Sequence, residues 1–378
     1  MSTPLETDFG AESQRNPADR AESPRLGGGL LTGPSSPKNI LLLGLSGIGN
    51  LLMQSPTIAL LKKRYPNAKL TIWVVPRGTK ALAQTMSEID HVIEAPIKAS
   101  PVTHLRHSFQ LSKHRFDTGI VLSPGQLWKS AAYLYLAGVP KRIGNSYPFS
   151  GKKDSRFLLT DAVPEIEDLH DIEQNLRLLQ PLGLSYSQPV TYQLNIPPPN
   201  QAQADALLKS LSLPPDKTLI GLHPGSAPDF LWRRWPLTNF AQVCRVLIAQ
   251  HNCHILILGG PEEKELREQL RKLVGQANSI DTDLLTTAGI ISQCTLLLSN
   301  DSGLMHLSAA IGTPTISLFG PTDESKTGPR GDQVHVIRAS GTKPVYHTEL
   351  NYHLGRQPHE SLLAIKPSDV LKELQQYL

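Results

Sequence analysis

The sequence predicts an α/β protein with two Rossmann-like, doubly wound halves, each built on a parallel sheet. Short apolar runs of strand length alternate with helical patterns twice along the chain. A segment over 185–200, which holds Ser, Gln and the three prolines Pro197 to Pro199, separates the two series. The length of 378 residues is more than one ordinary domain needs and suits two.

The first series begins with the apolar run Asn39 to Gly44, which predicts a buried strand. A tight loop is expected at Ser46 to Gly49. Apolar residues at helical spacing, with Lys62, Lys63 and Arg64 in the last turn, then predict a helix over Leu51 to Arg64. The remaining elements of this half are predicted as strands over 70–75, 91–95 and 118–122 and as helices over 80–86 and 127–137.

The second series predicts strands over 219–222, 254–258, 295–298 and 315–319, and helices over 237–250, 262–273, 284–294, 302–311 and 367–378. We place the domains at 38–190 and 191–378, and we expect the last helix to pack back on the first domain. The polar tail over 1–37 has too few apolar residues to offset its ordering entropy, so disorder is expected there. Ligands of open parallel sheets bind beyond the carboxyl ends of the strands, which predicts a cleft between the halves.

Composition narrows the class of protein. Hydrophobic residues make up 39% and charged residues 19%, as in soluble globular proteins, and the net charge of +4 suits an acidic ligand or a membrane surface. There is no membrane-spanning apolar stretch and no signal-peptide pattern, so we expect a cytoplasmic protein. No basic run or nucleic-acid module is present, which argues against nucleic acid. The cysteines lack metal spacing, and we expect buried reduced thiols at Cys244, Cys253 and Cys294.

The most informative segment runs from 296 to 322, where a buried strand leads directly into Asn-Asp-Ser-Gly and then a helix. Asp301 is a candidate N-cap, and Gly303 permits close approach to the backbone. The free amides and the positive end of the helix dipole suit a phosphate group, which Ser302 and Gly303 would contact. His306 faces either the core or the cleft. The alternative is structural, with Asp301 as a plain cap and His306 as a packed histidine.

Two further segments follow strand ends. The turn containing Ser226 leads to Arg233, Arg234 and Trp235, where a guanidinium would hold phosphate oxygens in a bidentate manner. The arginines could equally be a solvated pair, and Trp235 a packing anchor. In the other segment, Gly260 precedes Glu262, whose carboxylate would bind ribose hydroxyls or simply complement a helix dipole.

The opening loop, with Gly47, Gly49 and Asn50, resembles half of a dinucleotide fingerprint. Leu52 occupies the place of the last glycine, so the full pattern is absent and a nicotinamide oxidoreductase is disfavoured.

In combination, these segments resemble glycosyltransferase family 9, the family of the ADP-heptose:lipopolysaccharide heptosyltransferases. The resemblance extends from about Asn39 to Arg338 and includes His-Pro-Gly from His223, Arg-Trp-Pro from Arg234, Gly259-Gly260 and the block from Asn300 to Thr322. It implies a GT-B fold of two Rossmann-like domains facing a central cleft. The donor would bind mainly to the C-terminal domain and the acceptor to the N-terminal one.

The resemblance also implies an inverting transfer that needs no metal and no cofactor. The substrates would be a nucleotide-diphospho-sugar, with heptose as one candidate sugar, and a lipopolysaccharide or other cell-surface glycan. Positive groups and helix amides would neutralise the departing diphosphate. The donor-binding residues implied, from the resemblance and the segments above, are Ser226, Arg233, Arg234, Gly260, Glu262, Asp301, Ser302, Gly303 and His306, with Gly47 and Gly49 in the opening loop.

Asn50 departs from the pattern, because heptosyltransferases of the family usually carry an aspartate there as the presumed catalytic base. An amide orients a hydroxyl but takes no proton at neutral pH. Three explanations are open: another carboxylate serves as the base, a highly dissociative transition state needs little help from a base, or the chain is a donor-binding scaffold without transfer activity. A nucleotide-sugar epimerase is a further alternative. Basic residues near Lys62 to Arg64, or from His104 to Arg115, would allow contact with the inner membrane face.

Overall fold

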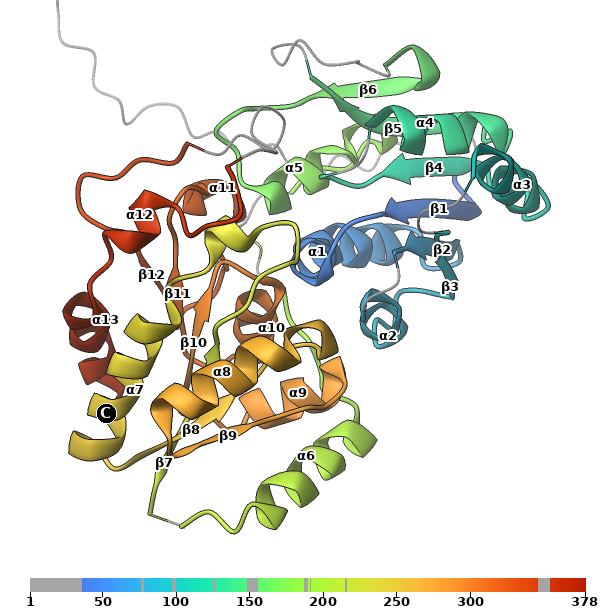
Figure 1. The fold of residues 1–378 in the computed structure, drawn as a ribbon. Coiled ribbons are helices and arrows are strands. Elements are labelled where there is room, and N and C mark those ends of the chain that lie inside the picture. Colours follow the sequence, from blue (N-terminus) through green and yellow to red (C-terminus); the bar gives the residue numbers. More distant parts are fainter. Residues whose placement is uncertain are drawn as a thin grey trace, which may run out of the picture. The chain divides into compact units, whose positions relative to one another are not determined.

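A computed structural model gives the fold, and it describes residues 36–75, 78–96, 100–124, 127–147, 156–186, 190, 192–214, 216–345 and 354–378. Two six-stranded sheets carry the two halves (Figure 1). The ladders pair in parallel, as the alternation of strands and helices predicts. All but the last two residues of the predicted disordered tail lie outside the described part of the chain.

The first sheet has the strand order β3-β2-β1-β4-β5-β6. Its central strands are apolar on both faces because helices cover both sides, and all but the first residue of β1 is buried. The strands are β1 (Asn39–Gly44), β2 (Lys69–Val74), β3 (His91–Glu94), β4 (Thr118–Val121), β5 (Lys141–Ser146) and β6 (Asp161–Pro164).

The helices of this half are α1 (Ile48–Arg64), α2 (Thr79–Gln84), α3 (Pro101–Ser112), α4 (Leu127–Leu136) and α5 (Asp171–Arg177), with short 3₁₀ turns η1 (Arg156–Leu158) and η2 (Gln180–Leu182). The expected loop at Ser46 to Gly49 is partly wrong, because α1 already begins at Ile48 with Gly47 as its N-cap. Sequence patterns did not reveal α3, β5, β6 or α5. These elements are short or carry polar residues throughout, so their periodicity is weak.

The second sheet has the order β12-β11-β10-β7-β8-β9. Its strands are β7 (Thr218–His223), β8 (Cys253–Ile257), β9 (Ala277–Ser279), β10 (Leu296–Asn300), β11 (Thr315–Leu318) and β12 (Val334–Ile337). Its helices are α6 (Pro198–Ser210), α7 (Leu237–Gln250), α8 (Lys264–Val274), α9 (Leu284–Ile291), α10 (Gly303–Ile311), α11 (Glu324–Thr327), α12 (Glu360–Leu363) and α13 (Pro367–Leu374), with the turns η3 (Leu231–Arg233), η4 (Pro261–Glu263) and η5 (Gln375–Tyr377).

The segment with three prolines starts a helix rather than serving only as a linker. Pro197 is the N-cap of α6 and Pro198 its first residue, where a missing backbone N–H costs nothing. α6 packs against α9. The domain boundary that we expect near residue 190 therefore lies just before an element of the second half.

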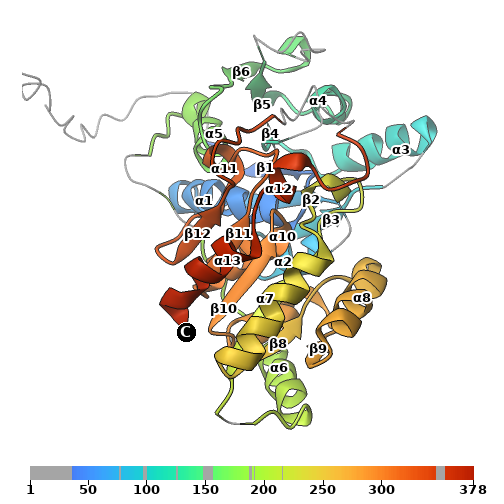
Figure 2. The ribbon, with the colours of Figure 1, turned by 60° about the vertical axis from the view of Figure 1, so that its left-hand side comes forward.

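The last helix differs from its expected position. α13 packs against α7, and its buried Val370 and Leu374 join the core of the second sheet (Figure 2). The prediction that it packs on the first domain is therefore wrong. All three cysteines are buried thiols, as expected. No helix in the described ranges is long and apolar enough to cross a membrane.

The two halves are joined through packed helices. α1 of the first half contacts α10 of the second half. One apolar cluster contains Leu51 and Leu52 from α1 together with Leu304 and Leu307 from α10. Since both helices follow strands of parallel sheets, this contact brings together the carboxyl edges of β1 and β10.

Candidate functional site

The start of α10 is the centre of the candidate site. β10 ends at the buried Asn300, Asp301 and Ser302 follow, and the helix begins at Gly303. Ser302 is the N-cap, and its side chain accepts no hydrogen bond from the first amides of the helix. The prediction that Asp301 caps the helix is therefore wrong. Uncapped amides at the positive end of a helix dipole form a site for a phosphate group.

The start of α1 lies directly against the start of α10. A Cβ atom at Gly303 would lie 3.2 Å from Cβ of Ile48 and 3.5 Å from the nitrogen of Gly49. α1 also lacks a side-chain cap. Two uncapped helix N-termini, one from each half, thus meet at one place, and their dipoles both favour an anion there.

The two glycines of the opening loop have different roles. A Cβ atom at Gly49 would lie 2.5 Å from Cδ2 of His306, so Gly49 is required for packing between α1 and α10. A Cβ atom at Gly47 would meet nothing within 4 Å, so this N-cap position is open. Asn50 lies in the first turn of α1 and is partly exposed.

His306 belongs to the joint between the halves, and the packed-histidine alternative describes it well. Its ring is 4% exposed, and Nδ1 lies 2.7 Å from the hydroxyl of Tyr192. That hydroxyl also accepts a hydrogen bond of 3.2 Å from the backbone N–H of Arg330. Burial, assisted by the nearby His170, lowers the pKa of His306 to about 3. The ring is therefore neutral at physiological pH.

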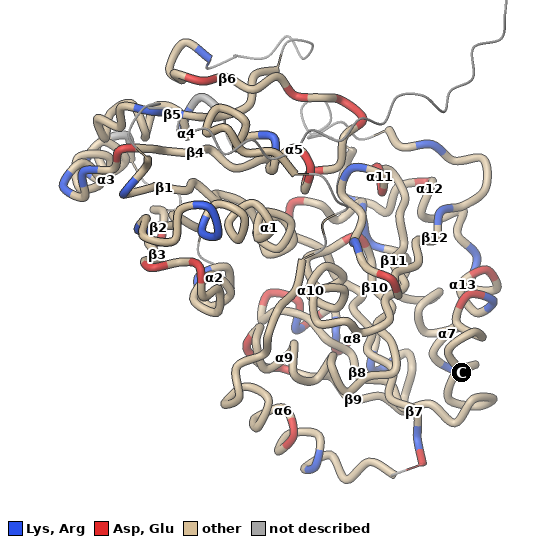
Figure 3. Tube along the Cα trace, turned by 180° about the vertical axis from the view of Figure 1, so that it is seen from behind, with Lys and Arg blue, Asp and Glu red and all other residues tan. Residues whose placement is uncertain are grey.

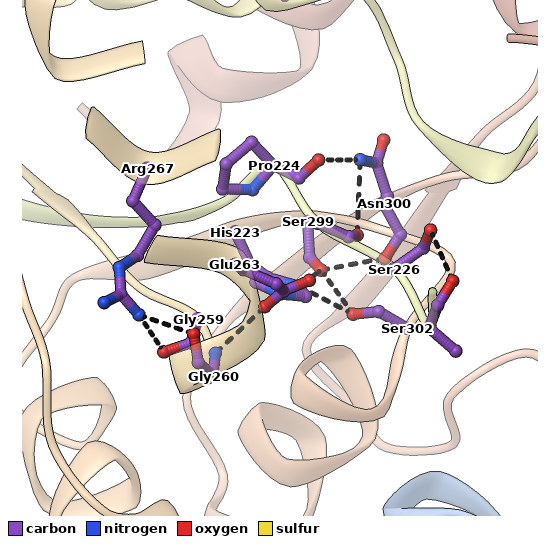
Figure 4. A network of polar contacts seen from close by, with 12 residues as sticks. His223, Pro224, Ser226, Gly259, Gly260, Glu263, Arg267, Ser299, Asn300 and Ser302 are labelled. Atoms are coloured by element: carbon purple, nitrogen blue, oxygen red, sulfur yellow. Dashed lines mark hydrogen bonds and ion pairs between the residues drawn. The ribbon is translucent and has the colours of Figure 1, made fainter. Parts of the chain in front are cut away.

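A buried polar network that includes the N-cap residue Ser302 stabilises the start of α10 (Figure 4). Nδ1 of His223, the last residue of β7, lies 2.9 Å from the hydroxyl of Ser302, and Nε2 lies 3.0 Å from a carboxylate oxygen of Glu263. Ser299 lies 3.0 Å from Ser302 and completes the network. The pairing of Ser299 with His223 in the ladder between β10 and β7 places these side chains side by side. The sequence signal for His223 was the His-Pro-Gly turn at a strand end, which was not assigned a role.

The two glutamates after β8 have separate roles. Glu263 is buried, accepts a hydrogen bond of 2.9 Å from the N–H of Gly260, and contacts His223. Burial alone would raise the pKa of Glu263, but His223 and the Gly260 amide outweigh burial and lower this pKa overall. Glu263 is therefore an anion within the polar network. Glu262 is exposed beside Gly260 and stays available for a ligand. Gly225 has no space for a side chain, since its Cβ atom would lie 1.7 Å from Oε1 of Glu263.

Arg233 and Asp301 form an ion pair next to this polar network. Nη1 of Arg233 lies 3.0 Å from Oδ2 of Asp301, and the guanidinium lies over the rings of Phe230 and Trp232. Asp301 is 5% exposed, whereas the Arg233 side chain is 19% exposed and reaches the surface. Asp301 therefore positions Arg233 rather than capping a helix.

Arg234 and Trp235 stabilise the turn after β7. Arg234 donates hydrogen bonds to the hydroxyl of Ser226 at 3.1 Å and to its carbonyl at 2.8 Å, so these two predicted ligand residues are bonded to each other. Trp235 is buried, its indole N–H donates to the carbonyl of Ile365, and its backbone N–H donates to the amide oxygen of Asn300. The packing-anchor interpretation of Trp235 is confirmed.

The structure thus brings Ser302, Gly303, His306, Arg233 and Asp301 together with the opening loop of the first half. Glu262, Gly260, Ser226 and Arg234 lie around the same edge of the second sheet, on the loops after β7 and β8. Within the described ranges, no group of three or more His, Cys, Asp or Glu side chains has the arrangement of a metal site.

Comparison with known proteins identifies similar chains. The sequence model of glycosyltransferase family 9 (heptosyltransferase) matches residues 104–351. Lipopolysaccharide heptosyltransferase 2 of Salmonella typhimurium is 27% identical, and the alignment covers 90% of this chain and 98% of that protein. Lipooligosaccharide heptosyltransferase 2 of Haemophilus influenzae is 28% identical, with 90% and 99% covered. The solved ADP-heptose LPS heptosyltransferase II of Escherichia coli superimposes with a TM-score of 0.70 at 24% identity, covering 90% of this chain and 98% of that one.

Proposed function

This chain belongs to glycosyltransferase family 9, and we propose that it transfers heptose from an ADP-heptose donor to a lipopolysaccharide acceptor. It is a glycosyltransferase with the GT-B fold of that family. The donor and acceptor named here are those of its relatives, which align with nine-tenths of the chain.

The observation that carries the proposal is the meeting of the α1 and α10 N-termini at the Gly303–Gly49 contact. A diphosphate has enough oxygen atoms to accept hydrogen bonds from amides of both helix starts. Arg233, held by Asp301 at the mouth of the site, adds a full positive charge. Amides and guanidinium groups that are already in place stabilise the charge of a departing diphosphate without reorganisation.

We propose that the transfer inverts the anomeric centre and needs no metal or cofactor. The acceptor oxygen would attack the anomeric carbon from the side opposite the diphosphate, and the helix amides and Arg233 would stabilise the leaving group. The exposed carboxylate of Glu262 is the group proposed to bind the ribose hydroxyls. His306, being neutral and buried at the joint, would contribute shape and a hydrogen bond rather than charge.

The experiment is a transfer assay with ADP-heptose and lipopolysaccharide from a strain that lacks heptosyltransferase activity, combined with thermal unfolding in the presence of ADP. The proposal predicts heptosylated product and a higher melting temperature with ADP. A shift with ADP but no product with any acceptor would favour the scaffold alternative suggested by Asn50. An altered sugar nucleotide formed without acceptor would favour an epimerase.

We further propose that the enzyme contacts an anionic membrane at the cytoplasmic face through α3. Val102, Leu105 and Phe109 lie three and four residues apart on one helix face and are 76%, 43% and 57% exposed. Exposed Arg106 lies on the same helix and exposed Lys113 is its C-cap, and Figure 3 shows basic residues around α3. An exposed apolar stripe with flanking basic residues is the pattern of a helix that binds an anionic lipid surface.

Sedimentation with phosphatidylglycerol vesicles, compared with phosphatidylcholine vesicles, tests this contact. The protein should sediment with the anionic vesicles, and Phe109→Ser should reduce the bound fraction. Leu363→Ser, which changes an exposed leucine in the second half, is the matched control and should bind normally. Equal sedimentation with both lipids would remove the proposal.

A further inference from the structure

The first half carries its own group of buried polar side chains, at the carboxyl ends of β4 and β5. The N–H of Ser123 donates to Oδ1 of Asn175 at 2.8 Å, and Nδ2 of Asn175 donates back to the Ser123 carbonyl at 2.9 Å. Nε2 of Gln54 donates to the same carbonyl at 3.0 Å. One peptide carbonyl therefore links α1, which carries Gln54, to α5, which carries Asn175.

The positions one helical turn earlier are occupied by Asn50 on α1 and Asp171 on α5. Residues four apart share a helix face, so Asn50 lies on the face of Gln54 and Asp171 on the face of Asn175. The two helices pack against each other, and both begin at the carboxyl edge of the first sheet (Figure 1). Asn50 and Asp171 thus both lie at the N-terminal ends of two packed helices, one turn before the residues that share the Ser123 carbonyl.

This place borders the second half. Nε2 of His170, the residue before Asp171, donates to the carbonyl of Gly328 at 2.9 Å. The charged groups that act on Asp171 are Glu165 from the loop before α5 and Lys326 from α11. Asp171 in turn acts on the phenol of Tyr147, beyond β5. Burial, with Glu165 adding to it and Lys326 opposing it, raises the pKa of Asp171 to about 7.

A second observation indicates that a polar ligand group binds here. Asn145, the penultimate residue of β5, is 3% exposed and lies beside Tyr147. The amide acts as a hydrogen-bonding neighbour of the Tyr147 phenol, but neither amide atom has a hydrogen bond of standard geometry to a described residue. A buried amide whose bonding capacity is not filled is costly, and such groups often serve a ligand or an ordered water. A sugar hydroxyl offers both a donor and an acceptor to this amide.

We propose that Asp171 is the general base of the transfer and supplies the function that Asn50 cannot. The acceptor oxygen forms a bond to the anomeric carbon, the bond from that carbon to the phosphate oxygen breaks, and its electron pair leaves with the nucleoside diphosphate. The acceptor's hydroxyl proton passes to the Asp171 carboxylate. The Asn50 amide, across from Asp171, orients the hydroxyl. This assignment rests on the proposed function and identifies its missing base.

The experiment measures kcat and its pH dependence with ADP-heptose and heptose-deficient lipopolysaccharide for the wild type, Asp171→Asn and Asp168→Asn. Asp171→Asn should lower kcat by about 10²–10⁴-fold and abolish the rise in rate around pH 7. Asp168→Asn removes an exposed charge three residues away and should leave both unchanged. The double variant Asn50→Asp/Asp171→Asn should regain activity, because the two positions flank the same hydroxyl.

Unchanged kcat and pH profile in Asp171→Asn would overturn the assignment while leaving the proposed function intact, since the wild type would still form product. Absence of product with the wild type would overturn both. The melting temperatures of Asp171→Asn and the wild type at pH 8 show whether a loss of rate arises from a folding defect. The amide lacks the buried charge, so Asp171→Asn should melt no lower than the wild type. If the variant melts at a lower temperature, the pH dependence of the wild-type kcat is the deciding measurement. A wild-type kcat that stays constant between pH 5.5 and 8.5 would exclude Asp171 as the base.

Discussion

The carboxyl edges of the two sheets are built in different ways. At the edge of the second sheet, His223, Glu263 and Ser302 bond to one another and form a closed frame behind the α10 amides. At the edge of the first sheet, the buried Oε1 atom of Gln54 and the buried amide of Asn145 make no hydrogen bond of standard geometry to a described residue, and Tyr147 lies beside that amide. The edge of the second sheet, the proposed donor edge, thus presents the α10 backbone amides to a ligand. The edge of the first sheet, the proposed acceptor edge, offers side-chain amide groups.

The largest expected effect tests the closed frame. Gly225→Ala would place a methyl group 1.7 Å from Oε1 of Glu263 and push that carboxylate away from His223 and the Gly260 amide. Glu263 would lose its hydrogen bonds to His223 and the Gly260 amide, and each hydrogen bond to a charged group contributes about 1.5–3 kcal/mol. Chemical denaturation should show a loss of this size. A loss below about 1 kcal/mol would mean that Glu263 moves freely and that the frame is not rigid.

The next effect concerns the charge at the donor edge. Arg233→Met should weaken ADP binding by about 1.5–3 kcal/mol, which is the typical contribution of a hydrogen bond to a charged group. Isothermal titration calorimetry measures this change. Arg245→Met removes an exposed arginine from α7 and is the matched control. Equal ADP affinity in both variants would show that Arg233 does not bind the diphosphate.

A third prediction compares two glycines in one loop. Gly49→Ala would place its Cβ atom 2.5 Å from the buried His306 ring and should destabilise the joint by about 1–3 kcal/mol, as overpacking does. Gly47→Ala meets open space with a φ of −76° and should cost less than about 1 kcal/mol. Thermal unfolding of both variants is the measurement. Equal losses would show that Gly49 has no special packing role.

A fourth prediction concerns the dependence of stability on pH. The folded-state pKa of His306 is about 3, below the ordinary histidine value of 6.5, so between these pH values the unfolded chain binds more protons at this site. Its contribution to stability is therefore lost as pH falls from about 6.5 toward 3, by up to about 1.4 kcal/mol per pH unit. His306→Gln should flatten the unfolding free energy over this range relative to the wild type. An identical slope in both proteins would contradict the assignment of a buried neutral ring.

The difference between the two edges also explains what the sequence could predict. The proposed donor edge consists of contiguous segments at strand ends, so the start of α10 and the turn that carries Arg233 after β7 could be inferred from local patterns. The pairing of these side chains could not be inferred from local patterns, because Asp301 and its partner Arg233 are 68 positions apart. The same holds for His223 with Glu263, which only the parallel ladder brings together.

The acceptor edge had almost no local signal. Ser123, Asn145 and Asp171 come from three separate loops or strand ends, and each is an ordinary polar residue in its own segment. α5 is seven residues long, and its short polar pattern gave no helical period. Asp171 becomes a candidate only when α5 is seen packed beside α1, the helix that carries Asn50.

The most direct test of the donor-edge account is a crystal structure of the enzyme with bound ADP. The account predicts that the diphosphate lies at the α10 N-terminus, with oxygen atoms within hydrogen-bonding distance of the Gly303 and Leu304 amides, close to the start of α1 and to Arg233. A diphosphate bound elsewhere, with those amides contacting only water, would contradict it.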